Sequence, residues 1–189
     1  MAARGDTYEN PVTGQRLTFL ATTADTGGAA LEVETAYRPG GARPPLHFHP
    51  SQQEDFEVLE GAVEAVVDGE RRTLQAGDVL TVPAGTPHAM WCEAAPARLR
   101  WRTAPALETE AFFETIWGLA AAGRMTSRGV LRLSQMALTG PEFKDEFRLA
   151  KPAWLTQMAI FTMLGPVARL QGLSARHAPP PAAAAPRVD

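Results

Sequence analysis

Apolar and polar residues alternate along short stretches of the first hundred residues, a pattern typical of strands that bury one face. In residues 31–37, LEVETAY, the glutamates at positions 32 and 34 face away from the residues at positions 31, 33, 35 and 37. Val63, Ala65 and Val67 show the same period, and Asp68-Gly69 predicts a hairpin turn before residues 70–74. Many short strands separated by Gly, Pro and Asp turns predict a mainly β sandwich or barrel over about residues 7–105.

The period of the apolar residues changes after this barrel. Residues 108–122 carry one helical stripe of Phe112, Phe113, Ile116, Trp117 and Ala120. Further helices are expected over residues 131–138, over residues 142–150, and from Pro152 towards Leu164, with breaks at Gly140-Pro141 and Gly165-Pro166. Residues 108–173 therefore predict a helical C-terminal extension, and the Pro/Ala-rich residues 174–189 predict a disordered tail.

The apolar run in residues 152–170 has two interpretations. A membrane span needs about 20 predominantly apolar residues, whereas this run carries Gln157 and is interrupted at Gly165-Pro166. We therefore expect a helix that is buried on the barrel or at a homodimer interface. Peripheral contact with a membrane surface is the alternative that we favour less.

Composition narrows the classes of function. The chain has 189 residues, of which 45% are hydrophobic and 21% charged, and its net charge of −3 argues against nucleic acid as a partner. The single cysteine, Cys92, excludes a disulfide within the chain and a Cys-rich zinc site. The first residues contain no apolar stretch of the kind found in secretory signals, so a cytoplasmic location is expected.

Three histidines of the strand region are candidate metal ligands. His47 and His49 are two residues apart, so on a strand they point to the same face, and His88 follows a Pro-rich loop. Glu54 opens an alternating stretch whose inward face is otherwise apolar, where a carboxylate is costly unless a cation pairs with it. Imidazole nitrogens suit several transition metals. The HxH pair alone is a weak signal, because such residues are more often packing or surface residues.

The spacing of these residues resembles the two motifs of the cupin superfamily. The first motif is matched, in order, by Gly41, His47, His49, Glu54 and Gly61. The second is matched by Gly77, Pro83, Gly85 and His88, with Cys92 in place of the final Asn. The resemblance implies a jelly-roll β-barrel that holds one divalent transition metal ion, such as Fe, Mn, Ni or Zn, through His47, His49, Glu54 and His88. Cys92 is expected to be a small buried residue rather than a ligand.

The whole chain also resembles single-domain quercetin-dioxygenase-like cupins with a helical C-terminal extension. This narrower resemblance implies a metal-dependent oxygenase acting on a small organic substrate, aromatic molecules included, with Glu54 also serving as a catalytic base. Two alternatives stay open. One is a metal-dependent isomerase, decarboxylase or cyclase of a biosynthetic pathway, and the other is a non-catalytic small-molecule-binding protein with a structural metal.

The remaining residues of the predicted barrel indicate what surrounds such a site. The inward positions are apolar, which suits an apolar or aromatic small-molecule ligand. Arg98, Arg100 and Arg102 alternate on one strand, and we expect them on its solvated outer face, because arginines are seldom buried unpaired.

Overall fold

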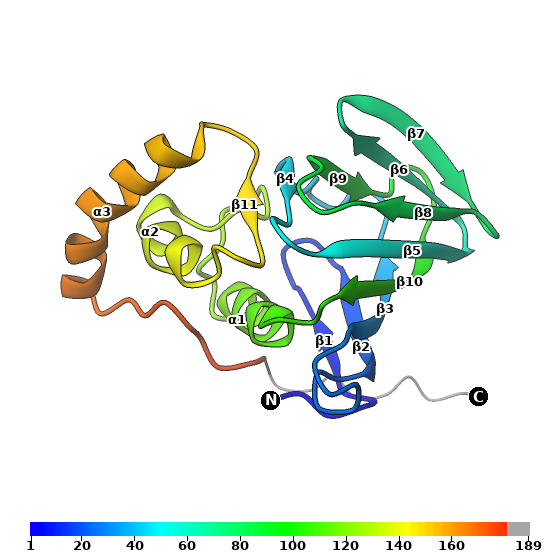
Figure 1. Cartoon of the computed structure of the whole chain (residues 1–189), viewed down its shortest axis with the longest axis horizontal. Helices are drawn as coiled ribbons and strands as arrows, with labels where there is room; N and C mark the ends of the chain where they lie inside the picture. Colours follow the sequence, from blue (N-terminus) through cyan, green and yellow to red (C-terminus); the bar gives the residue numbers. More distant parts are fainter. Residues whose placement is uncertain (181–189) are drawn as a thin grey trace.

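The computed structural model describes residues 1–180 and places a two-sheet barrel beside a layer of helices (Figure 1). Neighbouring strands are antiparallel, in the orders β1-β2-β3-β10-β5-β8 and β11-β4-β9-β6-β7. The first sheet contains β1 (Thr7–Glu9), β2 (Arg16–Ala21), β3 (Leu31–Tyr37), β10 (Ala97–Ala104), β5 (Gln53–Glu60) and β8 (Val79–Val82). The second contains β11 (Arg148–Leu149), β4 (His47–Phe48), β9 (His88–Trp91), β6 (Ala62–Val67) and β7 (Glu70–Gln75). The helices are α1 (Thr109–Ala121), α2 (Leu133–Glu142) and α3 (Trp154–Leu170), so the predicted fold class is confirmed.

The space between the two sheets is filled by the side chains that the alternation places inward. Phe56 and Val58 of β5 are 3% and 1% exposed, and every second residue of β6 is buried. These side chains form one cluster with apolar residues of β7, β8, β9 and β10. Because each buried aliphatic or aromatic side chain contributes roughly 1.5–3 kcal/mol, this cluster holds the two sheets together.

Two turns explain why glycines lie where they do. Asp68 and Gly69 join β6 to β7 with φ angles of 50° and 83°, the left-handed values that a two-residue hairpin turn requires. Gly61 also has a positive φ, and a Cβ at this position would lie 2.2 Å from the carbonyl oxygen of Pro96. Gly61 is therefore needed for a close approach of two backbone segments.

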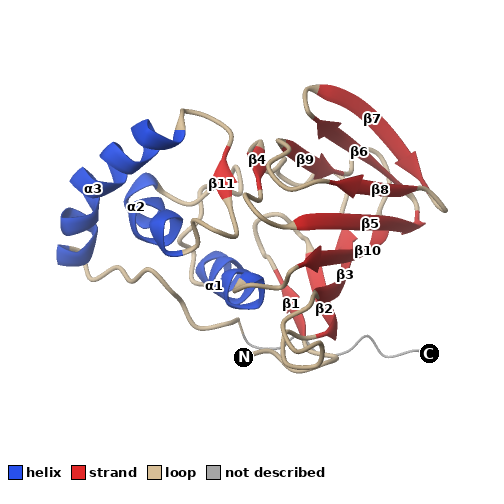
Figure 2. Ribbon diagram, in the orientation of Figure 1, coloured by secondary structure: helices blue, strands red, loops and turns tan. Residues whose placement is uncertain are grey.

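The helical layer contacts the barrel through α1, while α3 is the outermost helix (Figure 2). Phe112, Phe113 and Trp117 of α1 are at most 9% exposed and share a core cluster with Phe19 and Leu31 of the first sheet. The apolar stripe predicted for this helix is therefore its buried face. Among the helices of residues 1–180, none is long and apolar enough to cross a membrane.

The third predicted helix, over residues 142–150, is wrong. Helix α2 runs past Gly140-Pro141 and ends at Glu142, after which the chain turns and forms β11. β11 pairs with the free edge of β4, and the amide of Ala150 donates to the carbonyl of Leu46 at 2.9 Å. Pairing with this edge satisfies backbone groups that a short, isolated helix would have to satisfy alone.

The predicted interruption of the last helix at Gly165-Pro166 is also wrong, because α3 continues to Leu170. A proline inside a helix removes one backbone hydrogen bond, so packing must offset the loss. Gly165 is buried where α3 faces α2, and a Cβ there would meet the carbonyl oxygen of Ala137 at 3.9 Å. The tighter position at this crossing is Gly140 of α2, where a Cβ would lie 2.9 Å from Cε2 of Phe161 on α3.

The tail predicted as disordered from residue 174 needs correction in its first part. Residues 174–180 run along α1 and α2, where Arg176 forms ion pairs with Glu108 and Glu142. Hydrogen bonds to α2 and this pair of carboxylates fix a segment whose composition alone predicts no structure. The rest of the predicted tail, residues 181–189, lies outside the described part of the chain.

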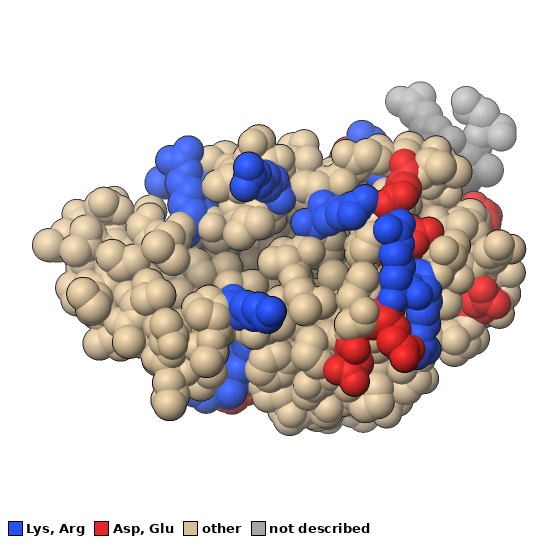
Figure 3. Space-filling model, turned by 90° about the horizontal axis from the view of Figure 1, so that it is seen from above, with Lys and Arg blue, Asp and Glu red and all other residues tan. Residues whose placement is uncertain are grey.

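Charged residues cover the outer surface of the barrel in pairs of opposite sign. Arg98 lies 2.6 Å from Glu60, and Arg102 lies 3.6 Å from Asp55, so the expected outer position of the arginines on β10 is confirmed. Figure 3 shows positive and negative side chains next to one another over the barrel. Such exposed pairs contribute little to stability, at most about 1 kcal/mol each.

Candidate metal centre

The four predicted ligands come together on the inner side of the barrel. His47 of β4 pairs in register with His88 of β9, and His49 follows β4 by one residue. One nitrogen from each histidine lies within 4.8 Å of the other two. Glu54 of β5 faces them, with 2.8 Å between its Oε2 and Nε2 of His88, and 3.2 Å between its Oε1 and Nε2 of His49.

The other ring nitrogen of each histidine faces a backbone carbonyl. Nδ1 of His47 lies 2.9 Å from the carbonyl oxygen of Pro45, and Nδ1 of His88 lies 3.0 Å from that of Thr86. Nδ1 of His49 contacts the carbonyl oxygen of Glu146. A carbonyl only accepts, so each Nδ1 carries a proton, and a ring that is neutral then has its lone pair on Nε2. This is the tautomer in which histidines with such partners bind metals through Nε2.

The charges of the site are set by burial and by close contact. Burial, reinforced by the neighbouring His88 and His49, lowers the pKa of His47 to about 3, so that ring is neutral. Burial opposes ionisation of Glu54, but His49 and His88 outweigh it, and the pKa of this carboxyl lies below its usual range. Burial also disfavours the charged form of His49, yet the carboxylate of Glu54 more than offsets it and raises the pKa of that ring. The carboxylate thus attracts positive charge to this point.

The unpaired atoms of the site fit a bound cation. Nε2 of His49 and Oε2 of Glu54 are buried and have no hydrogen-bond partner within residues 1–180, although they lie close to other ligand atoms. Buried polar atoms without a partner are rare and costly. A divalent transition metal at this point would contact both atoms, and three imidazoles with one carboxylate are a donor set that such metals accept.

Comparison with known proteins identifies the barrel. The model of the family described as "Cupin domain" matches residues 33–102. These residues of the barrel are therefore a cupin domain. The chain is 33% identical over 86 residues to a quercetin 2,3-dioxygenase of Bacillus subtilis, a match that covers 46% of this chain and 26% of that protein.

Two further proteins are similar to parts of this cupin. It is 44% identical over 55 residues to the oxidoreductase iacF of Pestalotiopsis fici, a match that covers 29% of this chain and 27% of that protein. The chain therefore spans about a quarter of the length of both curated relatives. A solved RmlC-like cupin from Shewanella frigidimarina has a TM-score of 0.49 and 23% identity, over 58% of this chain and 93% of that one.

Residues outside the cupin motifs complete the surroundings of the site. Nε1 of Trp101 donates to Oε1 of Glu54 at 3.0 Å, with the hydroxyl of Thr103 at 3.5 Å. The ring of Phe147, which directly precedes β11, stacks on His47 with the ring centres 4.7 Å apart and the planes 24° apart. The sequence offered a partial signal for Trp101, an inward indole that needs an acceptor, and none for Phe147.

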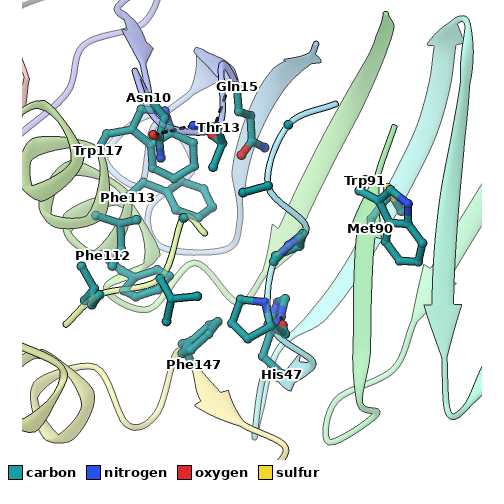
Figure 4. Close-up of a pocket in the computed structure, with 18 of the residues that line it drawn as sticks. Asn10, Thr13, Gln15, His47, Met90, Trp91, Phe112, Phe113, Trp117 and Phe147 are labelled. Carbon is teal, nitrogen blue, oxygen red and sulfur yellow. Dashed lines mark hydrogen bonds between the residues drawn. The ribbon is translucent and has the colours of Figure 1, made fainter. Parts of the chain in front are cut away.

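A cavity of about 190 Å³ extends from the histidines to the helical layer of this cupin (Figure 4). Its barrel side includes Met90 and Trp101, and the helical extension supplies Phe112, Phe113 and Phe147. The expected apolar lumen is therefore present, and half of its wall comes from outside the family match. Cys92 also lines the cavity; it is 3% exposed and belongs to the barrel core, as expected of a small buried residue.

Proposed function

We propose that this cupin is a metal-dependent oxygenase that acts on a small, largely apolar organic substrate, aromatic rings included. One observation carries the proposal. Three histidines, each with Nδ1 on a backbone carbonyl, converge at the wall of an aromatic cavity, where Nε2 of His49 and Nε2 of His88 lie beside Glu54. In the proposal His47, His49, Glu54 and His88 hold the metal. The similarity to a quercetin 2,3-dioxygenase and to an oxidoreductase supports oxygen chemistry over the alternatives.

In this proposal the metal, Glu54 and the aromatic wall have separate roles. The chemistry that a divalent transition metal supplies when bound is the activation of substrate or of dioxygen. Glu54 accepts hydrogen bonds from Trp101 and Thr103 at Oε1, and its Oε2, which would hold the metal, takes a proton from a substrate hydroxyl when it loosens from the metal. Phe112 and Phe147 stack on each other, with ring centres 5.3 Å apart, and exclude water from the side of the cavity nearest His47.

The test is a substrate screen on the metal-loaded chain in an oxygen electrode. A set of hydroxylated aromatic compounds is offered in air, and the same set is offered without oxygen. We expect oxygen uptake that depends on both substrate and metal. Turnover without oxygen would instead favour an isomerase, decarboxylase or cyclase. Tight binding without product would favour a non-catalytic binding protein with a structural metal.

Replacement of Glu54 separates holding the metal from moving the proton. Glu54→Gln keeps the shape of the side chain and one oxygen but no longer accepts a proton at that position. If Glu54 acts as the proposed base, turnover of a hydroxylated substrate falls by at least about a hundredfold even in molecules that retain metal. Unchanged turnover in metal-loaded Glu54→Gln would assign Glu54 to metal binding alone.

A further inference from the structure

The cavity has a second polar end, away from the metal centre. Figure 4 shows Asn10, Thr13 and Trp117 grouped at the opposite side of the cavity lining from His47. Asn10 and Thr13 belong to the loop between β1 and β2, and Trp117 belongs to α1. The part of the cavity between the two ends is lined mainly by aromatic and aliphatic side chains. A ligand that fills the cavity therefore meets polar groups at both ends and apolar walls between them.

Asn10 presents a hydrogen-bond donor at this distal end. The side chain is 3% exposed, and its Oδ1 accepts from the backbone amides of Val12 at 3.0 Å and Thr13 at 3.2 Å. These two bonds fix which way the amide group points, because only the oxygen can accept. The amide nitrogen is left 3.9 Å from the sulfur of Met125, and a thioether is a weak acceptor.

Trp117 is the second donor, and it has no acceptor at all in the described part of the chain. The residue is 5% exposed, and its Nε1 is buried without a hydrogen-bond partner. Its ring is held against Phe113, with ring centres 5.6 Å apart. Buried indole N–H groups almost always find an acceptor. The neighbouring amide of Gln15 donates from Nε2 to Thr35 at 2.9 Å, and its oxygen makes no hydrogen bond with Nε1 of Trp117.

We propose that Asn10 and Trp117 form a distal subsite that binds an acceptor oxygen of the substrate. The two N–H donors of Asn10 and Trp117 favour a carbonyl, ether or phenolic oxygen over an ammonium or amide N–H. The substrate is thus a flat apolar skeleton with an oxygen at each end, one near Glu54 and the histidines and one at Trp117. Only the assignment at the metal end rests on the proposed function.

Two bicyclic catechols of the same outline test the subsite. Esculetin carries a catechol at one end and a lactone carbonyl at the other, whereas the vicinal naphthalenediol has the catechol but no distal oxygen. Both are titrated calorimetrically into the full chain loaded with zinc, which is redox-inert and so prevents turnover. We expect esculetin to bind about tenfold more tightly, the effect of one well-placed hydrogen bond in a desolvated site.

Trp117→Phe removes the donor and keeps an aromatic ring. It should weaken esculetin about tenfold and change the affinity for the naphthalenediol less than twofold. Asn10→Asp keeps the oxygen that holds the turn but replaces the donor, so it should also weaken esculetin selectively. Phe113→Leu is the matched control, because it alters the same wall without removing a donor and should weaken both compounds alike.

Two results would overturn the distal subsite. One is equal affinity of wild-type protein for the two compounds, including the case in which neither binds, because a water molecule would then serve the donors. The other is an equal loss for both compounds in Trp117→Phe. A chelator-treated sample separates this result from the proposed function. If removing the metal leaves both affinities unchanged, the metal end is wrong, while the difference between the compounds still decides the role of Trp117.

Discussion

Phe147 links the helical extension to the metal centre, and its replacement gives a sharp test of that link. The ring stacks on His47 on one side and on Phe112 on the other, with ring centres 4.7 Å and 5.3 Å apart. β11, which begins at the next residue, pairs with the strand that carries His47. Phe147→Leu keeps an apolar side chain at this position but removes both stacked contacts.

The size of the effect follows from these two contacts. An aromatic pair contributes about 0.5–1.5 kcal/mol beyond burial, so the loss of both should destabilise the fold by about 1–3 kcal/mol. The contact with His47 also orients a proposed metal ligand. The same 0.5–1.5 kcal/mol, expressed as an affinity, is about a two- to thirteenfold increase in the metal dissociation constant. The effect stays moderate because Nδ1 of His47 keeps its contact with Pro45.

The assay is competition for metal with a chromophoric chelator, together with thermal unfolding of the metal-free chain. Phe143→Leu is the matched control. Phe143 is 1% exposed and packs against Phe112, with ring centres 5.4 Å apart, and Phe112 is not a metal ligand. We expect the control to lower the melting temperature at least as much while the metal dissociation constant changes less than twofold. An equal change of that constant in both variants, or none in Phe147→Leu, would refute the link.

Three further predictions concern Trp101, Cys92 and the exposed face of α3. Trp101→Phe removes the donor to Oε1 of Glu54, so metal affinity should fall about tenfold in the same competition assay, and an unchanged affinity would contradict the role of that contact. Cys92→Ser should retain metal by elemental analysis and lose a few degrees of melting temperature, because a buried hydroxyl costs about 1–3 kcal/mol; metal loss would make Cys92 a ligand. The expected homodimer stays a prediction. Leu155 and Met163 of α3 are 83% and 77% exposed, so light scattering should find a dimer, and Leu155→Asp and Met163→Asp should dissociate it. A monomeric native protein would rule the dimer out.

The barrel and the ligand cluster could be predicted from the sequence because their signals are local. Strand β3 occupies residues 31–37, the residues in which alternation is clearest, and the Asp68-Gly69 turn has the predicted positive φ angles. The spacing of His47, His49 and Glu54 brings the three side chains to one point because strand geometry fixes where alternate residues face.

The contribution of the helical extension could not be predicted, because it depends on contacts between distant segments. β11 is two residues long and has no alternation of its own; it forms because the edge of β4 is free. Gly140-Pro141 and Gly165-Pro166 indicated helix ends. Packing between α2 and α3 outweighs the backbone hydrogen bonds that the two prolines remove. Arg176 likewise fixes residues 174–180 only because two carboxylates meet there in the fold.

The central claim is that three imidazoles and one carboxylate bind a metal, and elemental analysis tests it most directly. The full chain, purified without a histidine tag, is compared with His49→Ala by mass spectrometry of its metal content. We expect about one divalent transition metal per native chain and a severalfold or greater loss in the variant, since His49 supplies a buried Nε2 without another partner in the described structure. A native chain without transition metal after reconstitution, or full occupancy in His49→Ala, would contradict the claim.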